Sequence, residues 1–320
     1  MYRNLPVVAL EEHYWDAELS QKSPGYEASR SEWQMKRLFD FDSLRIGEMD
    51  ANGIDVQVLS HGAPSIQRMK GQEAVDLARR CNDRLAEQIA RHPTRFYGFG
   101  MLPTDEPEAA AAELERCMRD LKFRGAMLHG QSNGVFLDNR RFWPIFERAS
   151  ALGAPIYLHP ATADARVTEA YYADYVKAFP MVVRPAWGYT VETATLAIRL
   201  VLSGVFEQCK NLQIILGHMG ETLPYQLWRI DQALARPGQE EMGFRKIFCD
   251  HFHITTSGHF STPALICAMM ELGLDRIMFS VDWPFVPNEP AMDWVKTLQL
   301  NETDMGKFLG GNAKRLLRLP

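Results

Sequence analysis

Short apolar runs alternate along the chain with longer segments in which apolar residues recur every three or four positions. A short run bounded by polar residues is typical of a buried strand, and the longer spacing is typical of a helix with one buried face. The apolar runs predict eight strands, at Val7–Leu10, Val56–Leu59, Phe96–Met101, Gly125–Leu128, Pro155–Leu158, Gln213–Leu216, Phe252–Thr255 and Arg276–Phe279. The helical spacing is clearest at Glu73–Arg91, Pro107–Asp120, Arg140–Leu152, Val191–Leu202, Leu223–Ala235, Pro263–Leu272 and Asp304–Leu317.

Strands that alternate with helices favour a parallel sheet, and eight such units close a (β/α)8 TIM barrel. The competing doubly wound α/β sheet places a glycine-rich phosphate turn after an early strand. The residues after the first predicted strand read EEHYWDAEL and contain no glycine. We therefore expect an α/β barrel formed by residues 1–320 as one domain, with two long insertions, Tyr14–Asp42 and Pro160–Tyr189, over the carboxyl-terminal face.

Composition narrows the class of protein. Of the 320 residues, 46% are hydrophobic and 23% are charged, which is ordinary globular composition. The net charge of −5, without a block of like charge, argues against nucleic acid or an anionic membrane as a partner. Five scattered cysteines without a CxxC pair predict reduced thiols and a cytoplasmic setting. We see no signal-peptide pattern and no apolar run long enough to cross a bilayer.

Residues capable of metal binding or proton transfer follow the predicted strands. In a barrel of this kind, a residue just past the carboxyl end of a strand faces the mouth in which ligands bind. These positions hold Glu11, Glu12, His13, His61, His129, His159, His218, Glu221 and Asp282. We therefore expect several of these side chains to approach one another in the mouth.

Glu11 and His13 are two residues apart, so on an extended segment they point the same way while Glu12 points to the other face. His159 and Asp282 reach the same mouth from other strands. Two carboxylates and two imidazoles suit a zinc or manganese ion in an open, catalytic site. Each signal is weak alone, because a strand-end histidine is often a core residue and an aspartate before Trp-Pro can cap a turn. Their coincidence at one face favours the metal site.

Five motifs, ALEEH, LHPAT, IILGHMGE, FHITTSG and SVDWPF, resemble the metal-dependent decarboxylase branch of the amidohydrolase superfamily. That branch includes aminocarboxymuconate-semialdehyde decarboxylase. The closest resemblance is to its nonoxidative benzoate decarboxylases, which act on γ-resorcylate (2,6-dihydroxybenzoate) or 5-carboxyvanillate. The motifs run through nearly the whole chain. The loop Gln21–Met35 and the segment 61–69 do not match a decarboxylase of known substrate, and we expect both to shape the pocket.

The resemblance implies that one divalent ion, commonly zinc or manganese, is bound by Glu11, His13, His159 and Asp282. It also implies that His218 and Glu221 form an acid–base pair near Asp282. We predict Asp282 as the proton donor, with His218 tuned by Glu221 as the alternative. Low-ranked candidates for substrate contact are His61, His129, Trp15, Trp187, Tyr189 and Phe285.

The leading hypothesis is nonoxidative decarboxylation of an ortho-hydroxylated aromatic acid by a carboxy-lyase active in aromatic catabolism. A hydrolase of a lactone, an amide or a ring-cleavage product is the first alternative, because the same ion could activate a water molecule. A non-catalytic barrel is the second, and it predicts a degraded set of metal ligands. The aromatic insertion Pro160–Tyr189 predicts a homodimer or a homotetramer.

Overall fold

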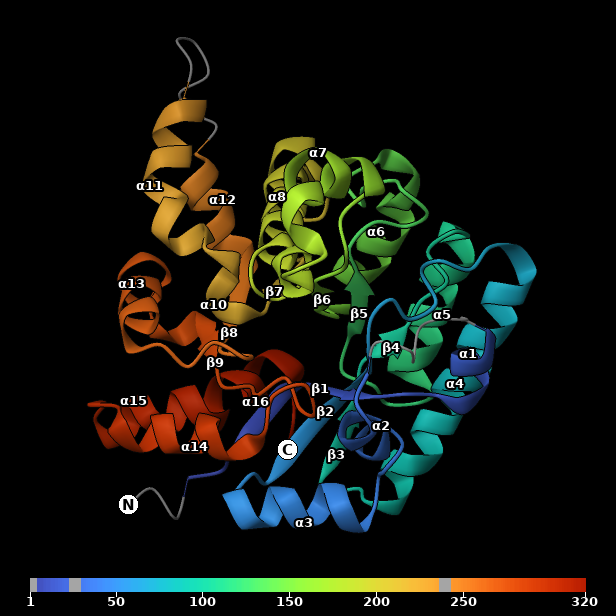
Figure 1. Cartoon of the computed structure of the whole chain (residues 1–320), viewed down its shortest axis with the longest axis vertical. Helices are drawn as coiled ribbons and strands as arrows, with labels where there is room; N and C mark the ends of the chain where they lie inside the picture. Colours follow the sequence, from blue (N-terminus) through green and yellow to red (C-terminus); the bar gives the residue numbers. More distant parts are fainter. Residues whose placement is uncertain (1–4, 23–29, 236–242) are drawn as a thin grey trace.

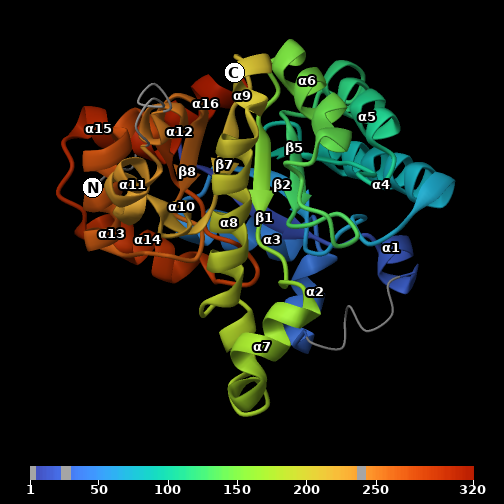
Figure 2. The same ribbon diagram turned by 90° about the horizontal axis from the view of Figure 1, so that it is seen from above.

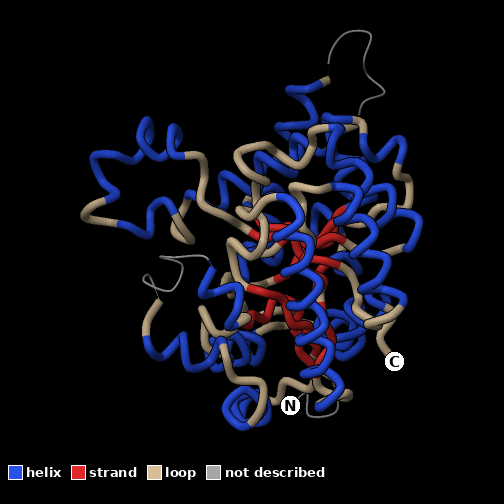
Figure 3. The backbone as a smooth tube through the Cα atoms, turned by 90° about the vertical axis from the view of Figure 1, so that its right-hand side faces the viewer, coloured by secondary structure: helices blue, strands red, loops and turns tan. Residues whose placement is uncertain are grey.

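The computed structural model describes residues 5–22, 30–235 and 243–320, and it is a (β/α)8 barrel (Figure 1). Its strands form a central ring with helices around it (Figure 3). Every hydrogen-bonded neighbour pair is parallel. The strands are β1 (Val8–Tyr14), β2 (Val56–His61), β3 (Phe96–Gly98), β4 (Gly100–Met101), β5 (Ala126–His129), β6 (Ile156–His159), β7 (Ile214–Leu216), β8 (Phe252–Thr255) and β9 (Ile277–Met278).

β3 and β4 are two parts of one predicted strand. The strands form two hydrogen-bonded sheets, in the order β1-β2-β3 and β4-β5-β6-β7-β8-β9. Only Phe99 separates the end of β3 from the start of β4. The Phe99 amide donates to the Leu59 carbonyl, whereas the Gly100 amide donates to the Gly125 carbonyl, so the chain itself joins the two sheets. All eight predicted strands are therefore confirmed, with ends displaced by a few residues.

The predicted helices are also present. They are α4 (Gly71–Arg91), α5 (Pro107–Arg119), α6 (Trp143–Leu152, after the 3-10 turn Arg140–Phe142), α8 (Gly188–Ser203), α11 (Leu223–Leu234) and α13 (Thr262–Leu272). The predicted helix Asp304–Leu317 is instead three pieces: α15 (Glu302–Gly306), a π-turn (Lys307–Gly311) and α16 (Asn312–Leu317). The π-turn lies against the first strand, where a side chain on Gly310 would collide with the Pro6 carbonyl.

The pattern did not reveal several shorter elements. These are α1 (Ala17–Lys22), α2 (Glu32–Leu38), α3 (Ser43–Asn52), α7 (Ala165–Val176), α9 (Val205–Gln208), α10 (His218–Glu221), α12 (Phe244–His251), α14 (Asn288–Thr297) and two 3-10 turns, Pro180–Val183 and Leu274–Arg276. The two predicted insertions contain α1 and α2, and α7 respectively. Figure 2 shows α7 projecting away from the barrel. Within the described residues, no helix combines the length and the apolar character that a membrane span needs.

Side chains alternate between two cores. Val8 and Leu10 point into the barrel with Val58, and Ala313 and Leu317 of α16 pack against that inner cluster. Ala9 packs outward, in the larger cluster between the strands and the helices. This period of two is the expected geometry of barrel strands.

Glu12 closes the barrel between β1 and the segment after β9. Its carboxylate is fully buried and accepts hydrogen bonds from the Ser280 hydroxyl (3.0 Å) and from the amides of Val281 (2.9 Å) and Trp283 (3.1 Å). The His13 amide donates to the Trp283 carbonyl at 2.7 Å, in the same seam. Burial raises the pKa of Glu12 to about 8. The two amides held by Glu12 flank Asp282, so this carboxylate also fixes the position of that side chain.

We predict that Glu12→Ala destabilises the fold by about 3 kcal/mol, because it leaves buried donors without an acceptor. Urea unfolding followed by circular dichroism measures the change. Glu169→Ala, the same substitution at an exposed position in α7, is the matched control. Equal unfolding midpoints for the two variants would show that the seam does not depend on Glu12.

Candidate metal centre

Four side chains meet at the carboxyl-terminal mouth of the barrel. Glu11 and His13 come from β1, His159 is the last residue of β6, and Asp282 follows β9. One potential ligand atom from each lies within 4.8 Å of all the others. His13 Nε2 is 3.3 Å from an Asp282 oxygen, and His159 Nε2 is 3.2 Å from a Glu11 oxygen. The structure thus brings together all four residues that the sequence indicated.

A β-bulge aims Glu11 into the mouth. Ala9 pairs with Gln57 and Glu12 with Leu59, so β1 has one extra residue over this step. Leu10 lies in the inner core and Glu11 accepts a hydrogen bond from the inward-facing Tyr157 hydroxyl, so two successive side chains point inward. Bulges commonly re-aim side chains beside active sites. Strict alternation from Val8 would instead have placed Glu12 in the mouth.

The unpaired atoms of the cluster are those that face its centre. Glu11 Oε1, His13 Nε2 and Asp282 Oδ1 are buried and have no hydrogen-bond partner among the described residues. The opposite atoms are occupied: His13 Nδ1 lies 3.1 Å from the Ser60 hydroxyl, and His159 Nδ1 donates to the Pro160 carbonyl at 2.7 Å. Buried polar atoms without partners are costly, and a cation among them would remove that cost. The donor set therefore fits a divalent ion of the zinc or manganese type, with the imidazoles oriented by outer hydrogen bonds.

The pKa shifts in the cluster show that a positive charge would stabilise its buried carboxylates. Burial raises the pKa of Glu11, and the neighbouring Asp282 carboxylate adds to the rise. Burial lowers the pKa of His159 well below its usual range, and His13 lowers it further, so the His159 ring is neutral and able to donate a lone pair. A bound cation would favour the ionised form of Glu11.

His218 and Glu221 form a pair beside the cluster. His218 Nδ1 is 2.8 Å from a Glu221 oxygen, and His218 Nε2 is 3.9 Å from Asp282 Oδ2. Burial alone would lower the pKa of His218, but the carboxylates of Glu221 and Glu11 outweigh it and raise that pKa well above its usual value. For Asp282, burial opposes ionisation, yet the adjacent His13 and His218 imidazoles hold its pKa below the usual range.

This pair sits on an unusual backbone turn. The five residues 218–222 all have positive φ, between 50° and 74°. A left-handed turn costs about 1–2 kcal/mol for each residue with a side chain, so it persists only where the surroundings hold it. Gly217, just before the turn, is required for close approach, because an added Cβ would lie 2.5 Å from Glu11 Oε2. The strain is concentrated where the pair meets the cluster.

A cavity of about 150 Å³ opens onto the cluster. His159, His218 and Asp282 form its floor, and Tyr189 and Phe285 are among its walls. The loop Gln21–Met35 contributes Arg30 and Gln34, and the segment 61–69 contributes Ala63. The remaining lining residues are Pro160, Met181, Arg184, Pro185 and Val286. A single aromatic ring is the size of ligand that such a cavity takes.

Four of the weaker substrate candidates do not line this cavity. Trp15 is buried, and the Arg30 guanidinium lies 5.9 Å from its ring. Trp187 is 49% exposed, just before α8. His61 Nε2 accepts from the Asp16 amide at 3.0 Å, and its Nδ1 donates to the Gly62 carbonyl at 2.9 Å, so it supports the backbone. The His129 ring lies 4.8 Å from that of His159 but lines a separate cavity.

Sequence reasoning missed residues that support or line the site. Tyr157 is two residues before His159 on β6, so the strand period alone could have placed it beside Glu11. Ser60 was visible at the end of the second predicted strand. Arg30, Gln34 and Arg184 gave no periodic signal, because they lie in the insertions. Part of the Gln21–Met35 loop, residues 23–29, lies outside the described residues.

Comparison with known proteins identifies the family. The model of a family described as Amidohydrolase matches residues 12–319. The chain belongs to the amidohydrolase family. Its relatives within that family include a gamma-resorcylate decarboxylase of Polaromonas sp. (strain JS666), 40% identical over 328 residues that cover 98% of each chain. The predicted family and the predicted group of decarboxylases are thereby confirmed.

Solved structures that are similar to this chain support the same family. The crystal structure of 2,6-dihydroxybenzoate decarboxylase complexed with 2,6-dihydroxybenzoate is 39% identical, with a TM-score of 0.90 over 98% of this chain and 100% of that chain. A dihydroxybenzoic acid decarboxylase from Polaromonas sp. JS666, with bound manganese and the inhibitor 2-nitroresorcinol, is 37% identical. Its TM-score is 0.88 over 98% of this chain and 97% of that chain. The predicted choice of zinc or manganese includes the metal of that relative.

We predict that the purified protein takes up one manganese or zinc ion per chain, and that His159→Ala weakens this uptake by about tenfold or more, since it removes one of four ligands. Equilibrium dialysis with elemental analysis measures the ion content. His92→Ala, which lies outside the cluster and pairs with Asp42, is the control. Failure of the wild-type chain to take up either ion would rule out both enzymatic hypotheses.

Proposed function

We propose that this amidohydrolase is a metal-dependent, nonoxidative decarboxylase of an ortho-hydroxylated benzoate, with 2,6-dihydroxybenzoate as the first substrate to test. The observation that carries the proposal is the buried cluster of four ligands with its unpaired atoms turned inward, beside the His218–Glu221 pair. Full-length identity of about 40% to gamma-resorcylate decarboxylases supports the same reaction.

Glu11, His13, His159 and Asp282 would hold the ion in this proposal. When bound, the ion supplies Lewis acidity, which stabilises negative charge developing on the substrate's oxygens. The Pro160 carbonyl and the Ser60 hydroxyl keep the two imidazoles turned toward the cluster. Tyr157 fixes Glu11 through a hydrogen bond to its outer oxygen. These outer contacts hold the four donors in place before substrate arrives.

The chemical step adds a proton to the ring carbon that bears the carboxylate. The bond between that carbon and the carboxylate then breaks, its electron pair restores the aromatic ring, and CO2 leaves. Asp282 lies on the cavity floor and is the proposed donor, with His218 as the alternative. The raised pKa of His218 and the lowered pKa of Asp282 favour a proton held on His218 in the resting site. His218 Nε2 is 3.9 Å from Asp282, which can pass that proton forward. Glu221 stabilises the protonated His218.

The cavity favours a flat, anionic substrate. Phe285 and Tyr189 offer ring faces to an aromatic acid. The Arg30 guanidinium stacks on Phe285 at 4.5 Å, and Arg30 and Arg184 make no ion pair within the described residues. A cavity of about 150 Å³ leaves little space beyond one substituted ring.

The direct test is product mass. We predict that the manganese-loaded protein releases CO2 from 2,6-dihydroxybenzoate or, within a panel of ortho-hydroxybenzoates, from a related acid. 5-Carboxyvanillate and aromatic ring-cleavage products complete the panel. Gain of water by any panel member without CO2 release would establish the hydrolase alternative and leave the metal site standing.

We predict that Asp282→Asn abolishes turnover, and that Glu221→Gln lowers kcat by about 10²-fold, because the second change weakens only the stabilisation of protonated His218. Initial rates of CO2 release measure both effects, and circular dichroism checks that each variant is folded. Glu302→Gln, on exposed α15, is the control for loss of one carboxylate. Wild-type turnover by Asp282→Asn would refute the proposed role.

We also infer that the chain forms a homodimer or a homotetramer. The second insertion exposes an apolar surface that supports this state: Tyr171 (72%), Tyr175 (61%), Phe179 (65%) and Met181 (51%). Exposed apolar patches of this kind are typical of interfaces. Light scattering at micromolar concentration is expected to give twice or four times the chain mass. A monomer would contradict the inference.

Residues 1–320 are proposed to act as one barrel domain. A cytoplasmic setting is proposed as well, supported by five cysteines that are all free of disulfides.

A further inference from the structure

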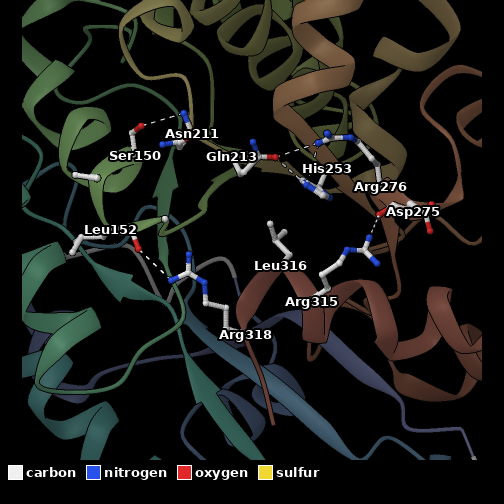
Figure 4. Close-up of a pocket in the computed structure, with 12 residues that line it drawn as sticks. Ser150, Leu152, Asn211, Gln213, His253, Asp275, Arg276, Arg315, Leu316 and Arg318 are labelled. Atoms are coloured by element: carbon white, nitrogen blue, oxygen red, sulfur yellow. Dashed lines mark hydrogen bonds between the residues drawn. The ribbon is translucent and has the colours of Figure 1, made fainter.

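A second and larger cavity, of about 770 Å³, lies at the opposite end of the barrel from the candidate metal centre (Figure 4). Gln213 precedes β7, His253 is the second residue of β8 and Arg276 precedes β9, so the cavity opens at the amino ends of these strands. α16 crosses this end and contributes Arg315, and Arg318 follows it. The mechanism proposed above uses none of these residues.

Positive charge dominates the lining. Arg276, Arg315 and Arg318 all line the cavity, and its one carboxylate, that of Asp275, is paired with Lys307 at 3.0 Å. Within the described residues, none of the three arginines makes an ion pair. Three guanidinium charges are therefore gathered at one end of the barrel without a direct ion pair, although Asp250 acts on Arg276, and Asp275 on Arg315, at longer range.

The arginines are held by neutral acceptors. Arg315 donates to the Asp275 carbonyl at 2.7 Å, Arg318 to the Leu152 carbonyl at 3.5 Å, and Arg276 to the Gln213 side-chain oxygen at 3.2 Å. Figure 4 shows these bonds reaching the rim from different elements. Each guanidinium has five N–H donors, so several remain available on each arginine. These contacts with uncharged acceptors hold the three guanidinium groups in place without neutralising their charge.

His253 is a buried histidine whose pKa is affected by the neighbouring arginines. It is 8% exposed, and its Nε2 lies 3.2 Å from an Arg276 nitrogen. Its Nδ1 is buried and finds no hydrogen-bond partner in the part of the chain that the structure describes. Burial, with further contributions from Arg276 and Arg315, lowers the pKa of His253 to about 3. The ring is thus neutral and cannot add to the repulsion among the arginines. An anion in the cavity would relieve that repulsion.

We propose that this cavity binds a small multivalent oxyanion, a bisphosphate or a polycarboxylate, through Arg276, Arg315 and Arg318. Planar guanidinium forks match the oxygens of phosphate and carboxylate groups. A single orthophosphate would fill only a small part of 770 Å³, and three separated cations call for a ligand with more than one anionic group. Neutral donors at the rim, such as the Asn211 side chain, suit the ligand's remaining oxygens.

Isothermal titration calorimetry of the manganese-loaded full chain tests the proposal, with fructose 1,6-bisphosphate and tricarballylate as probes at fixed free manganese. We expect one site per chain for at least one probe, with affinity that falls as sodium chloride is added. Arg315→Gln is expected to bind about tenfold more weakly, through loss of charge-assisted hydrogen bonds. Arg315→Lys is expected to be intermediate, because it keeps the charge and loses the fork.

Arg119→Gln is the matched control, since Arg119 is exposed on α5 and pairs with Glu115. Decarboxylation is expected to be unchanged in every variant, so this test does not depend on the proposed function. Arg318→Gln replaces Arg315→Gln if circular dichroism shows the latter unfolded. The probe that binds distinguishes phosphate from carboxylate ligands. Absence of binding by both probes, or equal binding by wild type and the cavity variants, would overturn the proposal.

Discussion

The carboxylate of Glu12 joins the first strand of the barrel to the last, and the candidate active site depends on that joint. Its two oxygens accept from the amides on both sides of Asp282, while its neighbours in β1 are Glu11 and His13. Three of the four members of the cluster are thus fixed by one buried side chain that does not belong to the cluster. Behind it, Arg45 is fully buried and donates to the His13 carbonyl at 2.6 Å, which stiffens β1 from the outer face.

This framework tolerates unfavourable features where chemistry is expected. Three buried atoms that have no partner within the described ranges and five consecutive positive φ angles lie within one region of the mouth. Either feature would destabilise an ordinary core by several kcal/mol in total. The hydrogen bonds of Glu12, Ser60 and Tyr157 hold the cluster residues in place, and the turn at 218–222 packs against β8 and α8. A cation would turn the first feature from a cost into a source of affinity.

The eight strands and seven helical segments could be predicted because apolar periodicity reports burial directly. β8 matches its predicted ends, and Glu11, His13, His159 and Asp282 were found because parallel strands bring their carboxyl ends to one mouth. The bulge in β1 could not be predicted, since an extra residue in a ladder leaves no mark in composition. Trp15 and Trp187 do not line the cavity, and the sequence could not show this because aromatic character does not say which face a loop residue presents. The positions of Arg30 and Arg184 depend on insertions without periodicity.

The two ends of the barrel gather charged side chains of opposite sign, carboxylates at one end and arginines at the other. At the carboxyl end, acidic side chains from β1 and the segment after β9 converge on one point with the imidazoles of His13 and His159. At the amino end, Arg315 of α16, Arg318 just after it and Arg276 just before β9 line one cavity. At the carboxyl end, His13 and His218 partly offset the charge of Asp282. At the amino end, none of the three arginines forms a direct ion pair with any described residue, and Asp275 pairs with Lys307 instead. A cation at the carboxyl end and an anion at the amino end would each be stabilised by the charged groups gathered there.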